Sequence, residues 1–363
     1  MRIGLVAPPW LTVPPTGYGG TELVIDLLAR GLAARGHEVR LFTVGTSTCP
    51  VPRADVFAEP QVPMGNTLSE TAQALSAYQA LADVDLVHDH TTVGPLAAAA
   101  AGVSAEGLAG GLSCPVVVTN HGPFTLAARV VFEELARHAA VVAVSHDQAR
   151  AAGPVPISAV IHHGIDTAAY QPGPGSGGYA LFVGRMSPDK GAHRAIRIAR
   201  SAGLPIVVAT KVQDREERQF FVEQVEPLLG PDVELLHDVA IDRKVALYQD
   251  AVALLNPISW PEPFGLVMIE ALASGTPVLA YPSGAAPEIV DPGRTGFLCS
   301  DEDDMAMRLG EIGQISRFAC REAAEERFSM ERMAADHERL YERLLEGAGA
   351  RDCLTRLSHP GWG

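Results

Sequence analysis

The feature that most constrains the fold is a repeated pattern in which short apolar runs end in polar residues and are followed by helix-forming segments. In the first half of the chain, three such runs are Asp85–His90, Val116–Gly122 and Val141–His146. Apolar runs that alternate with helices in this way are typical of a parallel sheet that is covered on both faces. Such sheets bind ligands at the carboxyl ends of their strands. The pattern therefore predicts an α/β fold in which these polar residues form one wall of a binding cleft.

A stretch rich in glycine and proline, from Gln171 to Gly178, divides the chain into two similar halves and is the strongest linker signal in the sequence. The alternation restarts after it, with strands expected at Tyr179–Val183, Ile206–Ala209, Val233–Leu236, Val252–Asn256 and Val278–Tyr281. A chain of 363 residues is long enough for two hydrophobic cores. We therefore expect two Rossmann-like domains, residues 1–170 and 171–345, and a C-terminal tail, residues 346–363.

Composition argues against several classes of function. The net charge of −15 disfavours nucleic acid as a partner, because a phosphate backbone demands a basic surface. Hydrophobic residues make up 47% of the chain, too many for a disordered protein, yet no apolar run approaches the ~20 residues that a membrane span needs. The five cysteines form no C-x-x-C pair, which favours a reducing compartment over a disulfide or zinc framework. We expect a cytoplasmic protein, for which membrane contact is left open but is not indicated.

A glycine-rich loop, Gly17-Tyr18-Gly19-Gly20, precedes an expected helix over residues 21–35. Glycine lets the backbone approach a ligand closely, and a helix N-terminus favours an anion. The pattern is G-x-G-G rather than the dinucleotide fingerprint G-x-G-x-x-G, and no acidic residue closes the second strand, where Val44-Gly45-Thr46 stands. This disfavours an NAD-dependent dehydrogenase and leaves the loop as either a ligand site or a plain strand-to-helix turn.

Two cations, Arg185 and Lys190, open the second half of the chain. They follow the strand expected at residues 179–183 and flank a turn before a helix. A guanidinium and an ammonium placed in this way could both reach a diphosphate. The alternative is two solvated surface cations, as most arginines and lysines are. The position at the carboxyl end of a strand favours the binding role.

Two glutamates lie at the entrance to a short apolar helix. Glu262 stands between prolines in a loop where no helix can run, and Glu270 lies inside a helix expected from about Gly265 to Ser274. Because that helix is apolar nearly all round, Glu270 should be buried and in need of hydrogen-bond donors, which a ribose diol would supply. The unpaired N–H groups of the helix N-terminus could bind ligand oxygens between the two carboxylates.

Three histidines fall at the expected ends of strands. His121 should project at the mouth of the cleft, where it could hydrogen-bond a substrate sugar or simply cap the strand. His88 and His90 share one face of a strand, so they could form a metal pair, but no third ligand has a convincing spacing. We therefore expect one of these two to line the cleft, and we expect no metal site.

Taken together, these motifs resemble those of glycosyltransferase family 4, retaining enzymes of the GT-B fold, over nearly the whole chain. The matches are the E-x7-E signature at Glu262 and Glu270, the diphosphate clamp at Arg185 and Lys190, the first-loop glycine pair at Gly19-Gly20, the histidine of the catalytic region at His121, and the closing motif from Pro287-Glu288 to Gly296-Phe297-Leu298. The opening Pro14-Pro15-x-Gly17-Tyr18-Gly19-Gly20-Thr21-Glu22 is similar to that of a bacterial branch. The resemblance implies two Rossmann-like domains whose parallel sheets face each other across a cleft, and a last helix that crosses back to the first domain.

The resemblance also implies a role for each site residue. Arg185 and Lys190 would hold the diphosphate of a nucleoside diphosphate sugar, and Glu270 would bind its ribose. Glu262 would bind hydroxyls of the donor sugar, helped by backbone N–H groups of residues Phe264, Gly265 and Leu266. The catalytic set would thus be His121, Arg185, Lys190 and Glu262, while Gly19 and Gly20 would join the donor-binding set. In the family's mechanism the leaving phosphate accepts the proton of the acceptor on the same face, without a metal ion or other cofactor.

We therefore expect a metal-independent, retaining hexosyltransferase that acts on an acceptor hydroxyl, with a UDP-hexose favoured over a GDP-hexose as donor. Thr210-Lys211 and His237-Asp238 depart from the family's usual residues where the base and ribose should dock, and Gly284-Ala285 replaces a glycine pair. These departures leave the donor open. The alternatives are a nucleotide-sugar epimerase of the same fold, which the clamp and the E-x7-E pair disfavour, and a non-catalytic sugar-nucleotide binding protein.

Overall fold

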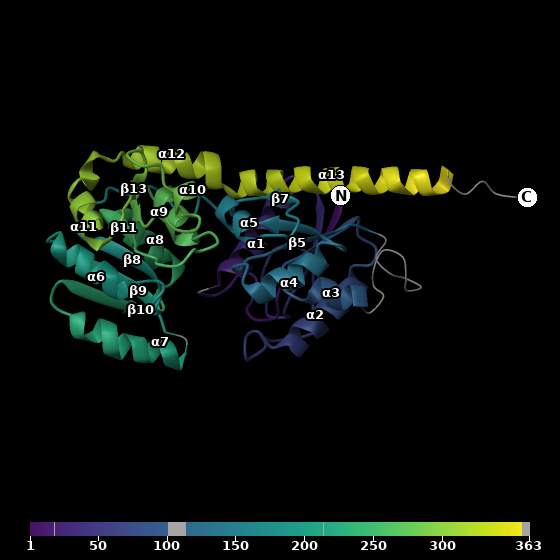
Figure 1. Ribbon diagram of the computed structural model, residues 1–363, viewed down its shortest axis with the longest axis horizontal. Helices are drawn as coiled ribbons and strands as arrows, with labels where there is room; N and C mark the ends of the chain where they lie inside the picture. Colours follow the sequence, from purple (N-terminus) through teal and green to yellow (C-terminus); the bar gives the residue numbers. More distant parts are fainter. Residues whose placement is uncertain (18, 101–113, 213, 358–363) are drawn as a thin grey trace, which may run out of the picture. The chain divides into compact units, whose positions relative to one another are not determined.

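The computed structural model describes residues 1–17, 19–100, 114–212 and 214–357, and the chain forms two compact units (Figure 1). Unit 1 consists of Met1–Val144, Gln148–His162 and the C-terminal segment that starts at Met330; unit 2 consists of Ser145–Asp147 and His163–Ser329. The chain thus passes between units close to residue 170, where the sequence suggests a junction. Residues 330–345, which the sequence pattern assigns to the second domain, lie with unit 1.

Unit 1 is built on a seven-stranded parallel sheet in the order β3-β2-β1-β4-β5-β6-β7. Its strands are β1 (Arg2–Val6), β2 (Glu38–Phe42), β3 (Arg53–Ala54), β4 (Leu86–Asp89), β5 (Val116–Thr119), β6 (Ala140–Ala143) and β7 (Ala159–Val160). The connecting helices are α1 (Gly20–Ala34), α2 (Thr67–Ala80), α3 (Gly94–Ala100), α4 (Leu126–Leu135) and α5 (His146–Ala151). The direction of strand addition reverses between β1 and β4, and open α/β sheets bind ligands at such a reversal.

The last helix, α13 (Met330–Leu357), packs against α1 within unit 1 (Figure 1). The two helices approach closely because Gly31 of α1 has no side chain: a Cβ there would lie 2.8 Å from the Cβ of Ala334. Nearer the surface, Glu338 pairs with Arg35 and lies 2.7 Å from His37 Nε2. The helix after Ser329 therefore belongs with the N-terminal half of the chain, as the family resemblance implies.

Unit 2 repeats the architecture with a six-stranded parallel sheet in the order β10-β9-β8-β11-β12-β13. Its strands are β8 (Ala180–Arg185), β9 (Ile206–Lys211), β10 (Val233–His237), β11 (Ala253–Asn256), β12 (Val278–Ala280) and β13 (Gly296–Leu298). Its helices are α6 (Ala192–Ser201), α7 (Arg215–Phe220), α8 (Ile241–Asp250), α9 (Leu266–Ala273), α10 (Ala286–Ile289), α11 (Glu302–Gly310) and α12 (Arg317–Phe328). Here the direction of strand addition reverses between β8 and β11.

The parallel α/β architecture predicted from the apolar runs is confirmed in both units. The observed strands β8 to β12 overlap the five strands expected in the second half. The strands that the apolar pattern does not reveal, β3, β7 and β13, are two or three residues long and lie at sheet edges. Such short segments carry too little pattern to be recognised. Among the described helices, none combines the length and the apolar character needed to cross a bilayer.

Candidate functional site

In unit 2, the predicted site residues gather where the strand order reverses. Arg185 ends β8 and Lys190 follows in the loop before α6, while Glu262 lies in the loop that joins β11 to α9. Because β8 and β11 are parallel neighbours, both loops leave the same carboxyl edge of the sheet. The fold thus brings side chains that are 72 positions apart in the sequence into direct contact.

Lys190 and Glu262 form an ion pair that is only partly satisfied. The Nζ of Lys190 donates to Oε1 of Glu262, and the two side chains are 11% and 17% exposed. Lys190 also lies over the ring of Trp260, 5.8 Å from its centroid. The second carboxylate oxygen of Glu262, Oε2, is buried and has no hydrogen-bond partner among the described residues. Leaving a buried acceptor unpaired costs about 1–3 kcal/mol, so this oxygen is suited to receive a hydroxyl from a ligand.

Two glycines hold Glu262 in position and leave room beside it. Gly284, at φ +58°, lets its loop approach the backbone of Glu262, because a Cβ there would lie 2.3 Å from the carbonyl oxygen of Glu262. The neighbouring Ala285 N–H donates to that carbonyl at 3.0 Å. Gly265, at φ +102°, caps the N-terminus of α9, and a Cβ there would lie 3.4 Å from the unpaired Oε2. The carboxylate therefore has a fixed backbone and a helix N-terminus next to it.

The residues at the start of α9 contribute mainly through their backbone. Phe264 is 3% exposed, and its ring packs edge-on against His163 and Phe328, with centroids 5.1 and 6.1 Å away. The first helical residue is Leu266, so N–H groups of this turn have no acceptor within the helix. The side chain of Phe264 thus anchors the loop. Ligand binding by the N–H groups of residues 264–266 stays a prediction.

Arg185 is oriented by a glutamate that the sequence motifs do not single out. Its Nη1 donates to Oε1 of Glu217 at 2.9 Å, and the side chain of Glu217 is 4% exposed. Glu217 belongs to α7, which is capped by Asp214 through a 2.8 Å hydrogen bond from the Glu217 N–H. In the sequence, Glu217 looks like any charged residue of an exposed helix. Its role becomes visible only when α7 is placed beside β8.

Glu270 is buried as predicted, but protein groups surround its carboxylate. Its Oε1 accepts from the Tyr170 hydroxyl at 3.0 Å and from Lys244 Nζ at 2.8 Å, while its Oε2 accepts from the Tyr248 hydroxyl at 2.9 Å. Burial, and next the charge of Glu270, raises the pKa of both tyrosines. The expectation that a buried Glu270 needs a ribose to supply its donors is therefore wrong, because three protein donors are present. A role for Glu270 at the ribose stays a prediction.

In unit 1, the glycine pair lies at the N-terminus of α1. Gly19 is the N-cap and Gly20 the first helical residue. A Cβ on Gly19 would lie 2.8 Å from Pro15 and 2.9 Å from Leu11, so the loop packs too closely for a larger residue. Glu22, in the first turn, is 4% exposed, and burial raises the pKa of its carboxyl group. The tight packing accounts for the glycine at position 19, and contact of either glycine with a ligand stays a prediction.

His121, which is half-buried, adjoins two buried imidazoles in unit 1, those of His88 and His90. Its Nε2 lies 2.9 Å from Nδ1 of His90, whose ring stacks on that of His88 with centroids 4.1 Å apart. His88 and His90 thus share one strand face, as predicted. The two nitrogens of His88 are hydrogen-bonded to Thr119 at 2.8 Å and to the Tyr341 hydroxyl of α13 at 2.7 Å. His88 therefore links the sheet to α13, and His90 contacts the predicted site residue.

Burial keeps His88, His121 and His337 neutral. It lowers the pKa of His121 to about 3 and that of His337, in α13, to about 4, with a smaller effect from neighbouring charges. It also lowers the pKa of His88 well below the usual range. A neutral imidazole donates from one nitrogen and accepts at the other. The bond to His90 therefore commits the Nε2 of His121 to the protein.

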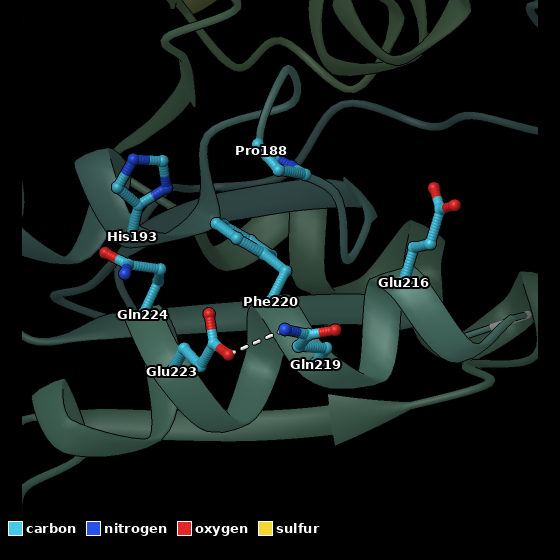
Figure 2. Close-up of a pocket in the computed structure, with 7 residues that line it drawn as sticks. All are labelled: Pro188, His193, Glu216, Gln219, Phe220, Glu223 and Gln224. Atoms are coloured by element: carbon cyan, nitrogen blue, oxygen red, sulfur yellow. Dashed lines mark hydrogen bonds between the residues drawn. The ribbon is translucent and has the colours of Figure 1, made fainter.

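A shallow hollow lies beside the clamp loop of unit 2 (Figure 2). Its volume is about 410 Å³, and its walls are formed by Pro188, His193, Glu216, Gln219, Phe220, Glu223 and Gln224. Figure 2 shows the ring of Phe220 at its centre, with Gln219 donating to Glu223 at 2.8 Å. None of the predicted donor-binding residues lines it. The hollow is therefore separate from the candidate donor site.

Comparisons with known proteins agree with this geometry. The model of Glycosyltransferase Family 4 matches residues 18–169, and that of Glycosyl transferases group 1 matches residues 171–312. The phosphatidyl-myo-inositol mannosyltransferase of Mycolicibacterium smegmatis is 28% identical over 351 residues, which covers 86% of this chain and 84% of that protein.

Two solved structures extend the comparison. AviGT4, a glycosyltransferase involved in avilamycin A biosynthesis, is 27% identical with a TM-score of 0.69, over 96% of this chain and 98% of that one. Anabaena HepE, solved in complex with UDP-glucose, is 20% identical with a TM-score of 0.72, over 95% of this chain and 99% of that one. The two parallel-sheet units, the matched family models and these neighbours together show that this chain is a glycosyltransferase of the GT-B fold and belongs to family 4.

Proposed function

We propose that this glycosyltransferase moves a hexosyl unit, with retention of configuration, from a nucleoside diphosphate sugar to an acceptor hydroxyl, and that it needs no metal ion. The observation that carries the proposal is the incomplete pair formed by Lys190 and Glu262. Its buried Oε2 needs a hydrogen-bond donor, which a sugar hydroxyl supplies, and the adjacent ammonium suits a phosphate. A sugar linked to a diphosphate offers both groups in one molecule.

Positive charge around this point supports a reaction without a metal ion. Arg185 ends β8 and Lys190 lies in the loop that follows it, and the N-terminus of α9 carries about half a positive charge from its aligned peptide dipoles. These groups would offset the charge that develops on the leaving diphosphate. Glu217 would hold the guanidinium of Arg185 in the orientation that this task requires.

In the proposed reaction, the bond between the anomeric carbon and the phosphate oxygen breaks while the acceptor oxygen bonds to the anomeric carbon on the same face. The proton of the acceptor hydroxyl passes to the departing phosphate oxygen, so the products are a glycoside and a nucleoside diphosphate. Glu262 would hold the hexosyl hydroxyls throughout. A UDP-hexose is the favoured donor, supported by the UDP-glucose bound to HepE, and a GDP-hexose is the second candidate.

The proposal is tested by incubating the purified protein with UDP- and GDP-hexoses, alone and with a panel of hydroxyl-bearing acceptors, and by measuring the nucleoside diphosphate released. We expect release from one class of donor, with the anomeric configuration kept in the product and no change when EDTA is added. Tight binding without release under any condition would favour the binding-protein alternative. Formation of a nucleotide sugar in which one stereocentre of the sugar is inverted would favour the epimerase.

A further inference from the structure

The cations and carboxylates proposed to hold the donor lie in unit 2, which leaves the carboxyl edge of the unit 1 sheet to bind the acceptor. In unit 1 the direction of strand addition reverses between β1 and β4, an arrangement that binds ligands in open α/β sheets. The loops that follow β1 to β5 contain no lysine or arginine in their sequence; they comprise residues 7–19, 43–52, 55–66, 90–93 and 120–125. The three lysines of the chain, Lys190, Lys211 and Lys244, all lie in unit 2. The edge therefore offers no cation from these loops.

Two arginines from helices that border this edge are committed to protein acceptors. Arg129, in the first half of α4, donates from its Nε to the carbonyl oxygen of Ala151 at 2.9 Å. Arg332, in the first turn of α13, donates from its Nη2 to the carbonyl oxygen of His162 at 2.9 Å. A phosphate on the acceptor would have to leave water without a free cation from either source, and burying an unpaired charge is costly.

The N-terminus of α1 is a second place where this edge could bind an anion, because unpaired N–H groups and the helix dipole favour negative charge there. A carboxyl group of the chain already occupies it. Glu22 stands at the third helical position, and its Oε2 lies 3.1 Å from where a Cβ on Gly19, the N-cap, would be. The same carboxyl group accepts a hydrogen bond from the backbone N–H of Glu22. A phosphate would therefore compete with Glu22 for the N–H groups of this turn and, where Glu22 is ionised, meet a like charge.

A neutral hydrogen-bond donor is available at the same edge. Asn120 directly follows β5 and is 7% exposed. Its Oδ1 accepts from the Gly122 N–H at 3.0 Å, which fixes the orientation of the amide. Its Nδ2 is buried and has no hydrogen-bond partner among the residues that the structure describes. A buried donor without a partner is unfavourable, so this amide is suited to the oxygen of an uncharged hydroxyl group.

We propose that the acceptor is a sugar or polyol without a phosphate group, and that the amide of Asn120 donates a hydrogen bond to one of its oxygens. This rests on the proposed function, in which the acceptor supplies a hydroxyl group. The loop sequences, the engaged arginines and the carboxyl group of Glu22 disfavour an anion, whereas the unpaired amide needs only a neutral oxygen. A buried water molecule is the simplest alternative partner for Asn120, and in that case the residue would not affect acceptor binding.

The first test measures release of the nucleoside diphosphate from the donor that the protein uses, with acceptors in matched sets. Each set holds a free sugar or polyol and its phosphate ester and methyl ether at the same hydroxyl, and different sets cover different hydroxyls. For the phosphate ester, kcat/KM should be at least about tenfold lower than for the free compound, whereas the methyl ether should stay within about threefold of it in at least one set. A phosphate ester that reacts better than its free compound would overturn the inference. Methyl ethers that lose as much as the phosphate esters in every set would also overturn it, because the loss would then come from the blocked hydroxyl and not from charge.

If no compound of the panel reacts, calorimetry on the protein loaded with the nucleoside diphosphate decides. A phosphate ester that binds with a Kd below about 1 mM would contradict the inference, and weaker binding of all the esters would support it.

The second test concerns Asn120. Asn120→Asp keeps the size of the side chain and the oxygen that accepts from Gly122, but it replaces the NH₂ donor by an oxygen. It should raise the KM for the accepted compound about tenfold and change the KM for the donor by less than about twofold. Asn66→Asp makes the same exchange at the exposed N-cap of α2, where aspartate caps equally well, and should behave like the wild type. An unchanged acceptor KM in Asn120→Asp would assign the amide to water and overturn its role. A wild-type protein that neither binds nor cleaves a sugar nucleotide would instead contradict the proposed function.

Discussion

Unit 2 contains two lysine–glutamate pairs that differ in how completely the carboxylate is satisfied. In one pair, Glu262 gives a single oxygen to Lys190, and its other oxygen is buried without a partner among the described residues. In the other pair, Glu270 receives Lys244 together with two tyrosine hydroxyls. The pair of Lys190 and Glu262 is therefore open to a ligand, and the pair of Lys244 and Glu270 is almost closed. The carboxylate that has an oxygen without a hydrogen-bond partner offers a position for a ligand. The carboxylate that accepts from three protein donors mainly stabilises the fold.

The largest expected effect is on activity, at the open pair. Replacing Glu262 by Gln or Ala should lower transfer by about 10²- to 10³-fold, the usual effect of removing one group that stabilises charge or position in the transition state. The free energy of unfolding should fall less than in the corresponding Glu270 variant, because the carboxylate of Glu262 has one protein donor and that of Glu270 has three. Lys190→Ala should likewise lower transfer by orders of magnitude without unfolding the protein. Near-normal turnover in both the Glu262 and Lys190 variants would remove the distinction between the two pairs.

The next largest effect is on stability, at the closed pair. Glu270→Gln keeps the shape of the side chain but turns an NH₂ group toward donors that need an acceptor. We expect the free energy of unfolding to fall by about 2–4 kcal/mol, because a hydroxyl or ammonium is left facing another donor in a buried site. Denaturant unfolding followed by circular dichroism measures this loss. If Glu262→Gln destabilised the fold as much as Glu270→Gln, the comparison between open and closed carboxylates would be wrong.

A smaller effect is expected for Glu217, whose carboxylate pairs with Arg185 of the diphosphate clamp. Glu217→Gln should raise the KM for the nucleotide sugar about tenfold, since Arg185 loses the ion pair that orients it, while kcat falls less. Its sequence neighbour offers a matched control, because Glu216 lines the hollow in Figure 2 and has no part in the clamp. Glu216→Gln should leave both parameters unchanged. If the two substitutions changed KM and kcat equally, α7 would act only through its negative charge and not by orienting Arg185.

The smallest effect concerns pH and the histidines of unit 1. Burial lowers the pKa of His337 to about 4, against about 6.5 in an unfolded chain. A neutral buried histidine therefore contributes its full stability above about pH 6.5 and loses it as the pH falls toward 4, because the unfolded chain takes up a proton that the folded protein does not. At pH 5.5 this histidine should cost about 1.4 kcal/mol of stability relative to pH 7.5. Denaturant unfolding of His337→Gln at the two pH values should show a correspondingly smaller difference.

Much of the donor site could be predicted because it depends on local rules. Apolar runs specify parallel strands, and parallel strands deliver their following loops to one edge, so the sequence alone is enough to place Arg185, Lys190 and Glu262 together. The burial of Glu270 could also be predicted, because its helix is apolar nearly all round. In unit 1 the same rules put His121 at a strand end and His88 beside His90 on one face.

The partners of these residues could not be predicted, because they depend on tertiary packing. Tyr170 is 100 positions away from Glu270 and precedes the linker, where nothing in the sequence suggests a contact with α9. Glu217 and Lys244 are charged residues on helices, and sequence patterns treat such residues as solvent-facing. Lys244 and Tyr248 do lie four positions apart and so share a helix face, a spacing that could have suggested a joint role.

The proposed chemistry depends above all on the unpaired oxygen of Glu262, which should receive the sugar of the donor. Calorimetry tests this by comparing the affinities of wild-type protein and Glu262→Gln for the hexose nucleotide that the protein uses and for the corresponding nucleoside diphosphate. We expect the substitution to weaken binding of the sugar nucleotide at least about tenfold and to change binding of the nucleoside diphosphate by less than about twofold. An equal loss for both ligands, or no loss for either, would contradict this role of Glu262.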